Sequence, residues 1–341
     1  MVKRMTKSRK FISQADLAKK LQLNSSTVSL ALSGHPRIPA ETQMRVKALA
    51  KKLGYKADVH ATRLAAKRWT NGKPKSWANI AYLQCHIHRG KADQYLPGLL
   101  RQADALGYHL DVLNSWEFTG NDHLNKVLYS RGVKGVVVGK SASNFRPYVP
   151  PLEKIAVVQC GLYWPVEIFT LVRSDLDAVV RLCFEKVRSQ NFRRIGMVLL
   201  HNPRAESDRI LENSIWNLKR IHPDNIEVFI EKWTSFDTYS VSLKKWFYRH
   251  KLDVVIGVNA LVHGILEHLG IKVPFACMIH DPHLPQFDGA DLQCAIMGEM
   301  SINLLDSYLR QNLLDNPPIK KVFMVEPVWH EGTTLSRRRV P

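Results

Sequence analysis

The sequence lacks the features that mark membrane proteins, secreted proteins and small metal-bound domains. No apolar run among its 341 residues approaches the ~20 residues that a membrane-spanning helix needs. The basic N-terminus is not followed by an apolar stretch, so we expect neither a secretory signal nor a membrane partner. The cysteines are few, odd in number and without a CxxC pair, which argues against disulfides and structural zinc and fits a reducing cytoplasm. They are Cys85, Cys160, Cys183, Cys277 and Cys294, and we expect them to be buried as small apolar side chains.

Acidic residues are scarce at one end of the chain. The whole chain has 49 Lys and Arg against 30 Asp and Glu, a net charge of +19. Residues 1–75 contain 18 of these basic residues and only three acids (Asp16, Glu41 and Asp58), which is a net charge of +15. The remaining residues contain 31 Lys and Arg against 27 Asp and Glu, a net charge of +4. We therefore expect the N-terminal segment to contact a polyanion and the rest of the chain to have another role.

Residues 12–54 show the apolar spacing of three short helices. The second is predicted over residues 25–33, after a tight break at residues 21–23, and the third follows Pro39 and ends at Gly54. The predicted inward positions are Ala15, Leu17, Ala18 and Leu21 in the first helix, Val28 and Leu32 in the second, and Val46, Leu49, Ala50 and Leu53 in the third.

Two short helices joined by a tight turn and closed by a third are typical of a helix-turn-helix, whose second helix lies in the DNA major groove. Burial of Val28 and Leu32 would leave Ser25, Ser26, Ser29 and Leu30 on the outer surface of that helix. A small helical bundle with a solvated basic face has the same spacing, so the spacing alone leaves both interpretations open.

The residues of this segment resemble the DNA-binding headpiece of the lactose/galactose repressor family. The likeness rests on residues 12–18 (ISQADLA), residues 27–34 (TVSLALSG), residues 53–55 (LGY), and Arg37, Ile38, Thr42, Arg45 and Val46. It runs without a gap and implies double-stranded operator DNA as the partner. The residues that it implies for DNA contact are Ser25, Ser26, Thr27, Ser29, Leu30 and Thr42.

The resemblance extends into residues 55–64, which in that family become helical on DNA. Leu64 stands where the family inserts a leucine into the minor groove, and Arg63 precedes it as a further DNA contact. An ordinary core leucine is the alternative for Leu64. Leu30 replaces a common base-reading arginine and offers only apolar contact, so we expect a different half-site at that base pair. Ala57 and Asp58 replace the usual Pro-Asn.

The segment after this hinge is longer than the usual link in the family. Residues 67–77 (KRWTNGKPKSW) are rich in Lys and Arg. They either add phosphate contacts or form a solvated tether, and the sequence favours neither.

From residue 78 onward, strands alternate with helices, which predicts parallel doubly wound sheets. Strands are predicted at residues 80–84, 108–113, 133–139, 155–159, 195–200, 226–230, 254–258 and 275–279. Helices are predicted at residues 96–106, 121–129, 176–188, 208–220, 239–250 and 261–269. Two such series indicate two similar lobes, with a ligand cleft between them at the carboxyl ends of the strands.

This region also resembles the effector domain of the same family, which shares the fold of periplasmic sugar-binding proteins. The best-matched segments are residues 132–138, 191–196, 253–259 and 270–274. The resemblance implies that Arg209, Trp233, Asn259 and Asp281 contact the effector, and these residue types suit a polyol. Each also has an ordinary structural interpretation, as a surface ion pair, a core aromatic or a cap. Ala260 replaces a usual aspartate, and Ile279-His280 replaces a usual Gly-aromatic pair, so the alternatives are an atypical effector and a site that has drifted from the family pattern.

Other chemistry finds little support in the sequence. His86 and His88 share one side of a strand, and His280 lies near His283, but no third metal ligand is identifiable. Nucleotide-binding and catalytic motifs do not occur, so neither a cofactor, a metal nor an enzymatic activity is expected.

The combined prediction is an α/β protein. An all-α helix-turn-helix headpiece (residues 1–56) is joined by a hinge helix and basic linker (57–77) to a two-lobed, doubly wound effector and dimerisation domain (78–335). The predicted function is a cytoplasmic homodimeric transcriptional regulator, a repressor, whose operator affinity a sugar switches by allostery. The alternatives are a DNA-binding dimer without an effector and a solute-binding protein.

Overall fold

The computed structural model describes residues 14–32, 38–53, 78–85, 93–140, 155–161, 170–202, 205–232, 235–314 and 321–335. The chain divides into two compact units, Met1–Lys75 and Ser76–Pro341. Within the described residues, no helix combines the length and apolar character needed to cross a membrane.

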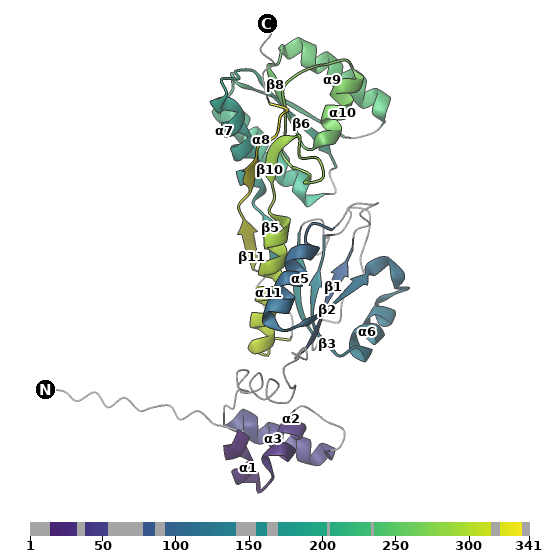
Figure 1. Ribbon diagram of the computed structural model, residues 1–341, viewed down its shortest axis with the longest axis vertical. Coiled ribbons are helices and arrows are strands. Elements are labelled where there is room, and N and C mark those ends of the chain that lie inside the picture. The colour runs from purple at the N-terminus through teal and green to yellow at the C-terminus, as the bar shows by residue number, and fades with distance from the viewer. Residues whose placement is uncertain are drawn as a thin grey trace, which may run out of the picture. The chain divides into compact units, whose positions relative to one another are not determined.

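The N-terminal unit contains the three predicted helices, α1 (Gln14–Leu21), α2 (Ser25–Leu32) and α3 (Ala40–Lys52) (Figure 1). Leu17, Val28 and Val46 are fully buried where the three helices meet. Ala31 is also fully buried, and the half-buried Leu32 packs against the same core. The three-helix prediction is confirmed, with Ala31 as an additional inward residue of α2.

The turn between α1 and α2 is tight because Gln22 adopts a left-handed backbone conformation, with φ of 52°. This conformation ends α1 and lets the Leu23 amide donate to the Ala18 carbonyl at 3.0 Å. Glutamine has no special preference for positive φ, so this backbone conformation is strained. Packing of Leu21 and Leu23 against the core of the unit offsets the strain. The break predicted at residues 21–23 is confirmed.

The C-terminal unit contains two six-stranded sheets (Figure 1). The first lobe is built on the order β11-β5-β4-β3-β1-β2, all parallel. Its strands are β1 (Asn79–Gln84), β2 (His109–Asn114), β3 (Val133–Val138), β4 (Ala156–Cys160), β5 (Thr170–Ser174) and β11 (Val322–Val325). Its helices are α5 (Leu96–Leu106), α6 (Asn121–Ser130) and α11 (Cys294–Arg310), with a short 3-10 turn, η1 (Ser115–Glu117).

The second lobe is built on the order β12-β10-β9-β8-β6-β7, in which only β12 pairs antiparallel. Its strands are β6 (Ile195–His201), β7 (Ile226–Lys232), β8 (Val254–Gly257), β9 (Phe275–Cys277), β10 (Asp288–Asp291) and β12 (Val328–His330). Its helices are α7 (Leu176–Ser189), α8 (Glu206–Ile221), α9 (Phe236–His250) and α10 (Ala260–His268).

Helices cover both faces of the first sheet, and this explains why its central strands are apolar on both sides. Tyr82 and Val137 pack toward α5 and α11, whereas Leu83 and Val136 pack toward α6. A parallel sheet buried in this way has near-continuous apolar strands rather than alternating ones. The doubly wound prediction is confirmed, and the predicted strands and helices from residue 80 to residue 279 are present with ends shifted by a few residues.

Along the described residues the chain crosses between the lobes at three places, β5 to α7, β10 to α11 and β11 to β12. No sequence pattern predicted β5, β10, β11 or β12, nor the bounds of α11. These strands are short, and β10 has the sequence Asp-Gly-Ala-Asp, which carries no apolar pattern. Only pairing with neighbouring strands makes them part of a sheet.

Candidate ligand cavity and nucleic-acid interface

Three serines lie on the same side of helix α2 and are exposed. Ser25, Ser26 and Ser29 are exposed, Thr27 and Leu30 are half-buried, and Val28 is buried. The cause is the 100° step between helical residues, which places Val28 toward α1 and α3 and turns the serines outward. The N-terminal part of α2 therefore presents hydroxyl groups to a partner. Thr42, also predicted to contact DNA, is half-buried in the first turn of α3.

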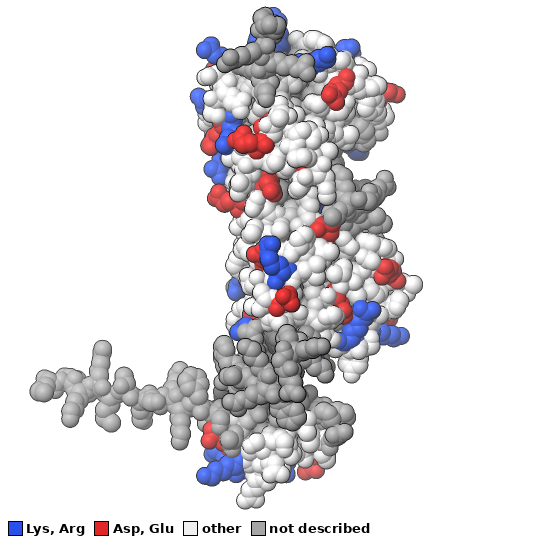
Figure 2. Space-filling view, viewed as in Figure 1, with Lys and Arg blue, Asp and Glu red and all other residues white. Residues whose placement is uncertain are grey.

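Exposed cations flank this helix in the same unit. They lie in the last turn of α1 and along α3, and they are Lys19, Lys20, Arg45, Lys47, Lys51 and Lys52. By contrast, acidic and basic side chains are interspersed on the face of the C-terminal unit that Figure 2 shows. Positive charge for phosphate contact is thus concentrated on the N-terminal unit. The predicted contacts Arg63 and Leu64 lie outside the described residues.

In the C-terminal unit, the described residues enclose a cavity of about 30 Å³ between the lobes. Its walls come from the carboxyl ends of strands, from helix starts and from the crossing segments. The lining residues are Tyr95, Lys140, Gly161, Ser174, Leu176, Ser207, Ile279, Leu292 and Met297. A cavity of this size holds about two water molecules and is too small for a sugar ring.

The wall formed by the first lobe is held by a buried carboxylate, Asp93. It accepts hydrogen bonds from the Tyr82 hydroxyl at 2.7 Å, from Gln84 Nε2 at 3.0 Å and from the Tyr95 amide at 2.9 Å. Burial, and then the charge of Asp93, raises the pKa of Tyr82 well above its usual value. Burial likewise raises the pKa of Tyr95, so both phenols are neutral donors at physiological pH.

Two glycines make room for these tyrosines. A Cβ atom on Gly139 would lie 2.5 Å from the Tyr82 hydroxyl, and one on Gly161 would lie 2.8 Å from the Tyr95 hydroxyl. Gly161 also has φ of 85°, which an L side chain rarely adopts. Glycine at the ends of β3 and β4 is therefore required for the tyrosines to reach the cavity wall.

The wall formed by the second lobe begins at α8. Asp208 is buried, with one carboxylate oxygen accepting from the Asn202 amide at 2.9 Å and the other from Ser207 Oγ at 3.1 Å. These bonds tie the end of β6 to the start of α8 and orient Ser207 at the cavity. Asp208 is thus the inward residue of this turn, and its neighbour Arg209 is exposed.

The predicted effector residues are distributed around this region rather than gathered in the described lining. Asn259 is the exposed N-cap of α10, where its side chain accepts from the Leu261 amide at 3.0 Å. Asp281 is half-buried, and its Oδ1 accepts from the His283 amide at 3.1 Å. Trp233 lies outside the described residues. Arg209, Asn259 and Asp281 are absent from the lining that the described residues form, and all four remain predictions.

Tyr95, Lys140, Ser174 and Ser207 line the cavity but were not predicted from the sequence. Lys140 and Ser207 could have been predicted as lining residues. Both follow predicted strands, and ligands bind at the carboxyl ends of such strands. Ser174 ends a strand that the sequence did not reveal, and Tyr95 begins a helix.

Histidine and cysteine side chains occupy ordinary packed positions. The five cysteines are buried thiols, as predicted, and burial raises the pKa of Cys85 to about 12. His280 is buried and stacks on His330, and His86 and His88 lie outside the described residues. The described residues contain no group of three possible metal ligands.

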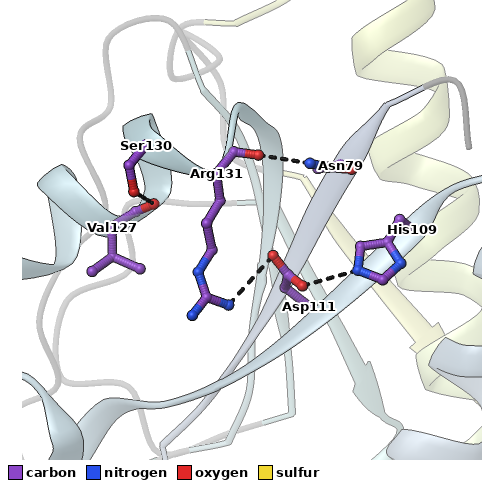
Figure 3. A network of polar contacts seen from close by, with 6 residues as sticks. All are labelled: Asn79, His109, Asp111, Val127, Ser130 and Arg131. Atoms are coloured by element: carbon purple, nitrogen blue, oxygen red, sulfur yellow. Dashed lines mark hydrogen bonds and ion pairs between the residues drawn. The ribbon is translucent and has the colours of Figure 1, made fainter.

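A separate polar network ties together the amino ends of β1, β2 and β3 (Figure 3). Asn79 Nδ2 donates to the Arg131 carbonyl at 2.6 Å, and Asp111 contacts both Arg131 at 3.5 Å and His109 at 3.1 Å. Asn79 is the first residue of β1, close after the linker segment. The network therefore anchors the point at which the chain enters the first lobe.

No protein-family model matches the sequence, and no curated protein matches it. Solved structures with the same fold are numerous. A LacI-family transcriptional regulator from Silicibacter pomeroyi has a TM-score of 0.51 at 17% identity, covering 96% of this chain and 100% of its own. The lac repressor dimer bound to operator and an anti-inducer has a TM-score of 0.51 at 14% identity, covering 96% and 99%.

A third structure covers a smaller share of the chain. It is a periplasmic binding protein/LacI transcriptional regulator from Alkaliphilus metalliredigens in complex with D-xylulofuranose. Its TM-score is 0.54 at 15% identity, covering 76% of this chain and 99% of its own. Likeness at these identities extends over nearly the whole chain, and the fold of this protein is that of the LacI-family transcriptional regulators.

Proposed function

We propose that this chain is a sequence-specific DNA-binding transcriptional regulator, acting as a repressor and as a homodimer. One observation carries the proposal. The buried Val28 face of α2 and the tight turn at Gln22 leave Ser25, Ser26 and Ser29 exposed at the start of α2, within a unit that has exposed Lys and Arg on α1 and α3. Hydroxyls that read base edges, flanked by cations that bind phosphates, are the two components of specific DNA recognition.

In the proposed complex, α2 lies in the major groove. Ser25, Ser26, Thr27 and Ser29 contact base edges or phosphates, and Leu30 contacts a thymine methyl. Thr42 and Arg63 contact the backbone, and Leu64 inserts into the minor groove at the operator centre. Two copies related by a two-fold axis would read a pseudo-palindromic operator, since the symmetry of a dimer imposes symmetry on its site.

We further propose that a small molecule, a sugar or sugar derivative, binds between the lobes. The cavity supports this, because Ser174 and Leu176 lie at the first crossing between the lobes and Leu292 at the second. A ligand there contacts the segments about which the lobes rotate. Arg209, Trp233, Asn259 and Asp281 would join the site in an arrangement of the lobes with a wider cleft.

The switch requires that the ligand bind one arrangement of the lobes more tightly than the other. The difference in binding free energy limits the change in operator affinity, which is typically ~1–3 kcal/mol in such systems. The solved structures of the same fold support the proposal by their ligands, an operator with an anti-inducer in one and D-xylulofuranose in another.

Selection of bound duplexes from a random DNA library, repeated with a panel of sugars, tests the proposal. A palindrome whose enrichment one sugar changes is the expected result. The absence of any enriched sequence would contradict the assignment of α2 as the recognition helix.

A DNA-binding dimer without an effector is the second candidate. It is favoured by the small volume of the cavity, about 30 Å³, and by the positions of Arg209, Asn259 and Asp281 outside the described lining. An enriched palindrome that no ligand affects would select this candidate. A solute-binding protein without DNA binding would leave the charge of +15 on residues 1–75 without a role.

A further inference from the structure

Two imidazole rings are stacked in the second lobe, beside the segments that lead into the first lobe. His280 lies after β9, His330 ends β12, and their ring centroids are 4.0 Å apart. The proposed function assigns no role to this pair. Such a stack is stable while at least one ring is neutral, because two imidazolium charges at this distance repel each other.

One nitrogen of the pair is buried without a partner. His280 is 5% exposed, and among the described residues its Nδ1 has no hydrogen-bond partner. A neutral ring can keep its proton on Nε2 and leave Nδ1 as a buried lone pair. Protonation would place a charged N–H at the same buried position without an acceptor, and such a donor costs more free energy than a lone pair. Uptake of a proton by His280 is therefore unfavourable while the ring stays in the stack.

The titratable groups that face His280 come from three segments. His330 faces it from β12, Asp291 from the end of β10 and Asp281 from its own loop. Burial, followed by the ring of His330, lowers the pKa of His280, and the two carboxylates act in the opposite sense. Each carboxylate already accepts a backbone amide, at 3.1 Å for Asp281 and at 2.8 Å for Asp291. They compensate only in part for a charge on the ring, so the ring must leave the stack to be protonated at little cost.

The other charged groups on the adjoining segments are paired or exposed. Lys186 of α7 lies 3.6 Å from Glu331, the residue after His330. Asp288, at the start of β10, accepts two backbone amides at 2.9 and 2.8 Å. His283 is exposed in the same loop as His280. A proton therefore acts mainly on the stacked rings and on the two carboxylates that face them.

The loop that carries His280 (residues 280–287) is tied to strands that lead into the first lobe. The His280 amide donates to the Ala290 carbonyl at 2.9 Å, near the end of β10, from which the chain crosses to α11. The Thr333 amide donates to the Gln286 carbonyl at 2.9 Å and joins the loop to the segment after β12. Ile279, directly before His280, lines the cavity. A movement of the His280 ring would therefore displace a wall of the cavity together with segments next to two of the described crossings.

We propose that the stacked pair of His280 and His330 is a pH-sensitive clamp, which holds residues 280–287 against β12 while both rings are neutral and releases them when His280 takes up a proton. The loop also carries Asp281, which the sequence predicts as an effector contact. The proposal rests on the proposed function in one respect. If the cavity binds an effector, release of this loop shifts the balance between two arrangements of the lobes and changes operator affinity with it.

Hydrogen exchange of the full chain at pH 7.5 and pH 5.5 tests the clamp without ligand or DNA, provided that each rate is divided by the intrinsic rate at the same pH. The reporters are the amides of His280, Leu284 and Phe287, which donate to backbone carbonyls in the loop or in β10. The amides of β7 (Ile226–Lys232) are the internal reference. At pH 5.5 the wild type is expected to lose protection at the reporters and to keep it in β7.

Two variants separate the clamp from a general effect of acid. His280→Phe keeps a ring in the stack but cannot take up the proton, so it should keep its protection at pH 5.5. His222→Phe is the matched control, because the His222 ring also stacks on an aromatic ring, that of Phe184 at 4.8 Å, at the end of α8. This control should lose protection in residues 280–287 as the wild type does.

A third variant covers the case in which His280→Phe does not fold. His330→Phe keeps both the stack and His280, and it removes the ring that opposes the protonation of His280. Its loss of protection should begin at a higher pH than that of the wild type. Loss of protection at the same pH in His330→Phe and in the wild type would count against the clamp.

Operator titrations at the same two pH values test the link to regulation. The ratio of operator affinities at pH 7.5 and pH 5.5 is expected to differ between the wild type and His280→Phe, and to be the same in the wild type and His222→Phe. Equal loss of protection in the wild type and His280→Phe, or loss in neither, would overturn the clamp. Equal affinity ratios in these two proteins would overturn its link to regulation. Failure of the proposed function is distinguishable, because it appears as the absence of an enriched palindrome, on which the exchange results do not depend.

Discussion

The imidazole ring of His280 stacks on that of His330, with ring centroids 4.0 Å apart and planes inclined by 16°. His280 lies after β9 and directly follows the cavity-lining Ile279, and His330 ends β12, the strand reached by the third described crossing between the lobes. His330 Nε2 contacts the Pro285 carbonyl at 2.8 Å. The stack therefore joins the loop that carries Asp281 to the last crossing.

Acidification should weaken this stack. Burial, followed by the neighbouring ring of His330, lowers the pKa of His280, while Asp291 and Asp281 act in the opposite sense. A histidine with a lowered pKa in the folded state binds fewer protons there than in the unfolded chain. Its contribution to stability is present above the unfolded value of about 6.5 and is lost as the pH falls below it.

Chemical denaturation at several pH values between 7.5 and 5.5 measures this effect. His280→Phe should reduce the acid-induced loss of unfolding free energy, because the variant has no imidazole to protonate at this position. His330→Phe, which keeps a ring in the stack but removes the second ring charge, should reduce it by less. Parallel pH curves for wild type and His280→Phe would refute the prediction.

The packing of α5 on α11 should tolerate no added methyl group at Gly98. A Cβ atom there would collide with the backbone carbonyl of Ala295, and one on Gly298 would lie 2.5 Å from the Tyr95 carbonyl. Backbone atoms cannot move aside as a side chain can. Gly98→Ala should therefore lower the free energy of unfolding by about 2–3 kcal/mol.

Gly264 in α10 is the matched control, because a Cβ atom there meets nothing within 4 Å. Gly264→Ala should raise the free energy of unfolding by about 0.5–1 kcal/mol, the difference in helix propensity. Denaturant titration measures both variants. A change of the same sign in both would show that propensity rather than close packing governs Gly98.

Leu64→Ala should weaken specific operator binding far more than non-specific binding. A leucine inserted between base steps kinks the duplex and allows wider contact only at a deformable operator centre, whereas phosphate contacts act on any sequence. Arg63→Gln, which removes a proposed backbone contact, should lower both affinities by similar factors. Titrations with operator and with scrambled duplex measure the specific and the non-specific affinity. Equal losses of affinity on both DNAs for Leu64→Ala would contradict the insertion of Leu64 into the minor groove.

Operator affinity should fall steeply with salt. If ~6–10 phosphates are neutralised, the affinity falls about 10³–10⁵-fold between 50 and 200 mM salt. The slope of log affinity against log salt concentration gives the number of released counterions. A flat response would contradict phosphate binding by the cations of residues 1–75.

The helices of the N-terminal unit and the alternating strands and helices between residues 80 and 279 were predictable. Each of them depends on the pattern of apolar residues within its own segment. Apolar spacing places Leu17, Val28 and Val46 on one side of their helices, and continuous apolar runs such as Val136–Val138 mark buried parallel strands. The predicted inward residues of α2, Val28 and Leu32, both pack in the core of the unit, but the deeper burial of Ala31 was not predicted, because helix rotation in a small core depends on its neighbours.

The ligand cavity was less predictable. Arg209 is exposed at the start of α8 and absent from the described lining, so its contact with an effector stays a prediction, while its neighbour Asp208 is buried. One residue along a helix is a rotation of 100°, and the sequence pattern alone does not show which of the two residues faces inward. Lys140 and Ser207 could have been identified from their positions after predicted strands, but Ser174 and Tyr95 could not.

The sequence by itself determined the two-part charge distribution, the three short helices of the N-terminal unit and the doubly wound lobes, because each depends on composition or on periodicity within a single segment. Tertiary structure alone decided the crossings between the lobes, the pairing of short strands such as β10, and the set of described residues that line the cavity. These features join residues far apart in the chain, for example Tyr95, Ser207 and Leu292. Their energies come from contacts that exist only once the sheets have formed, so no local pattern records them.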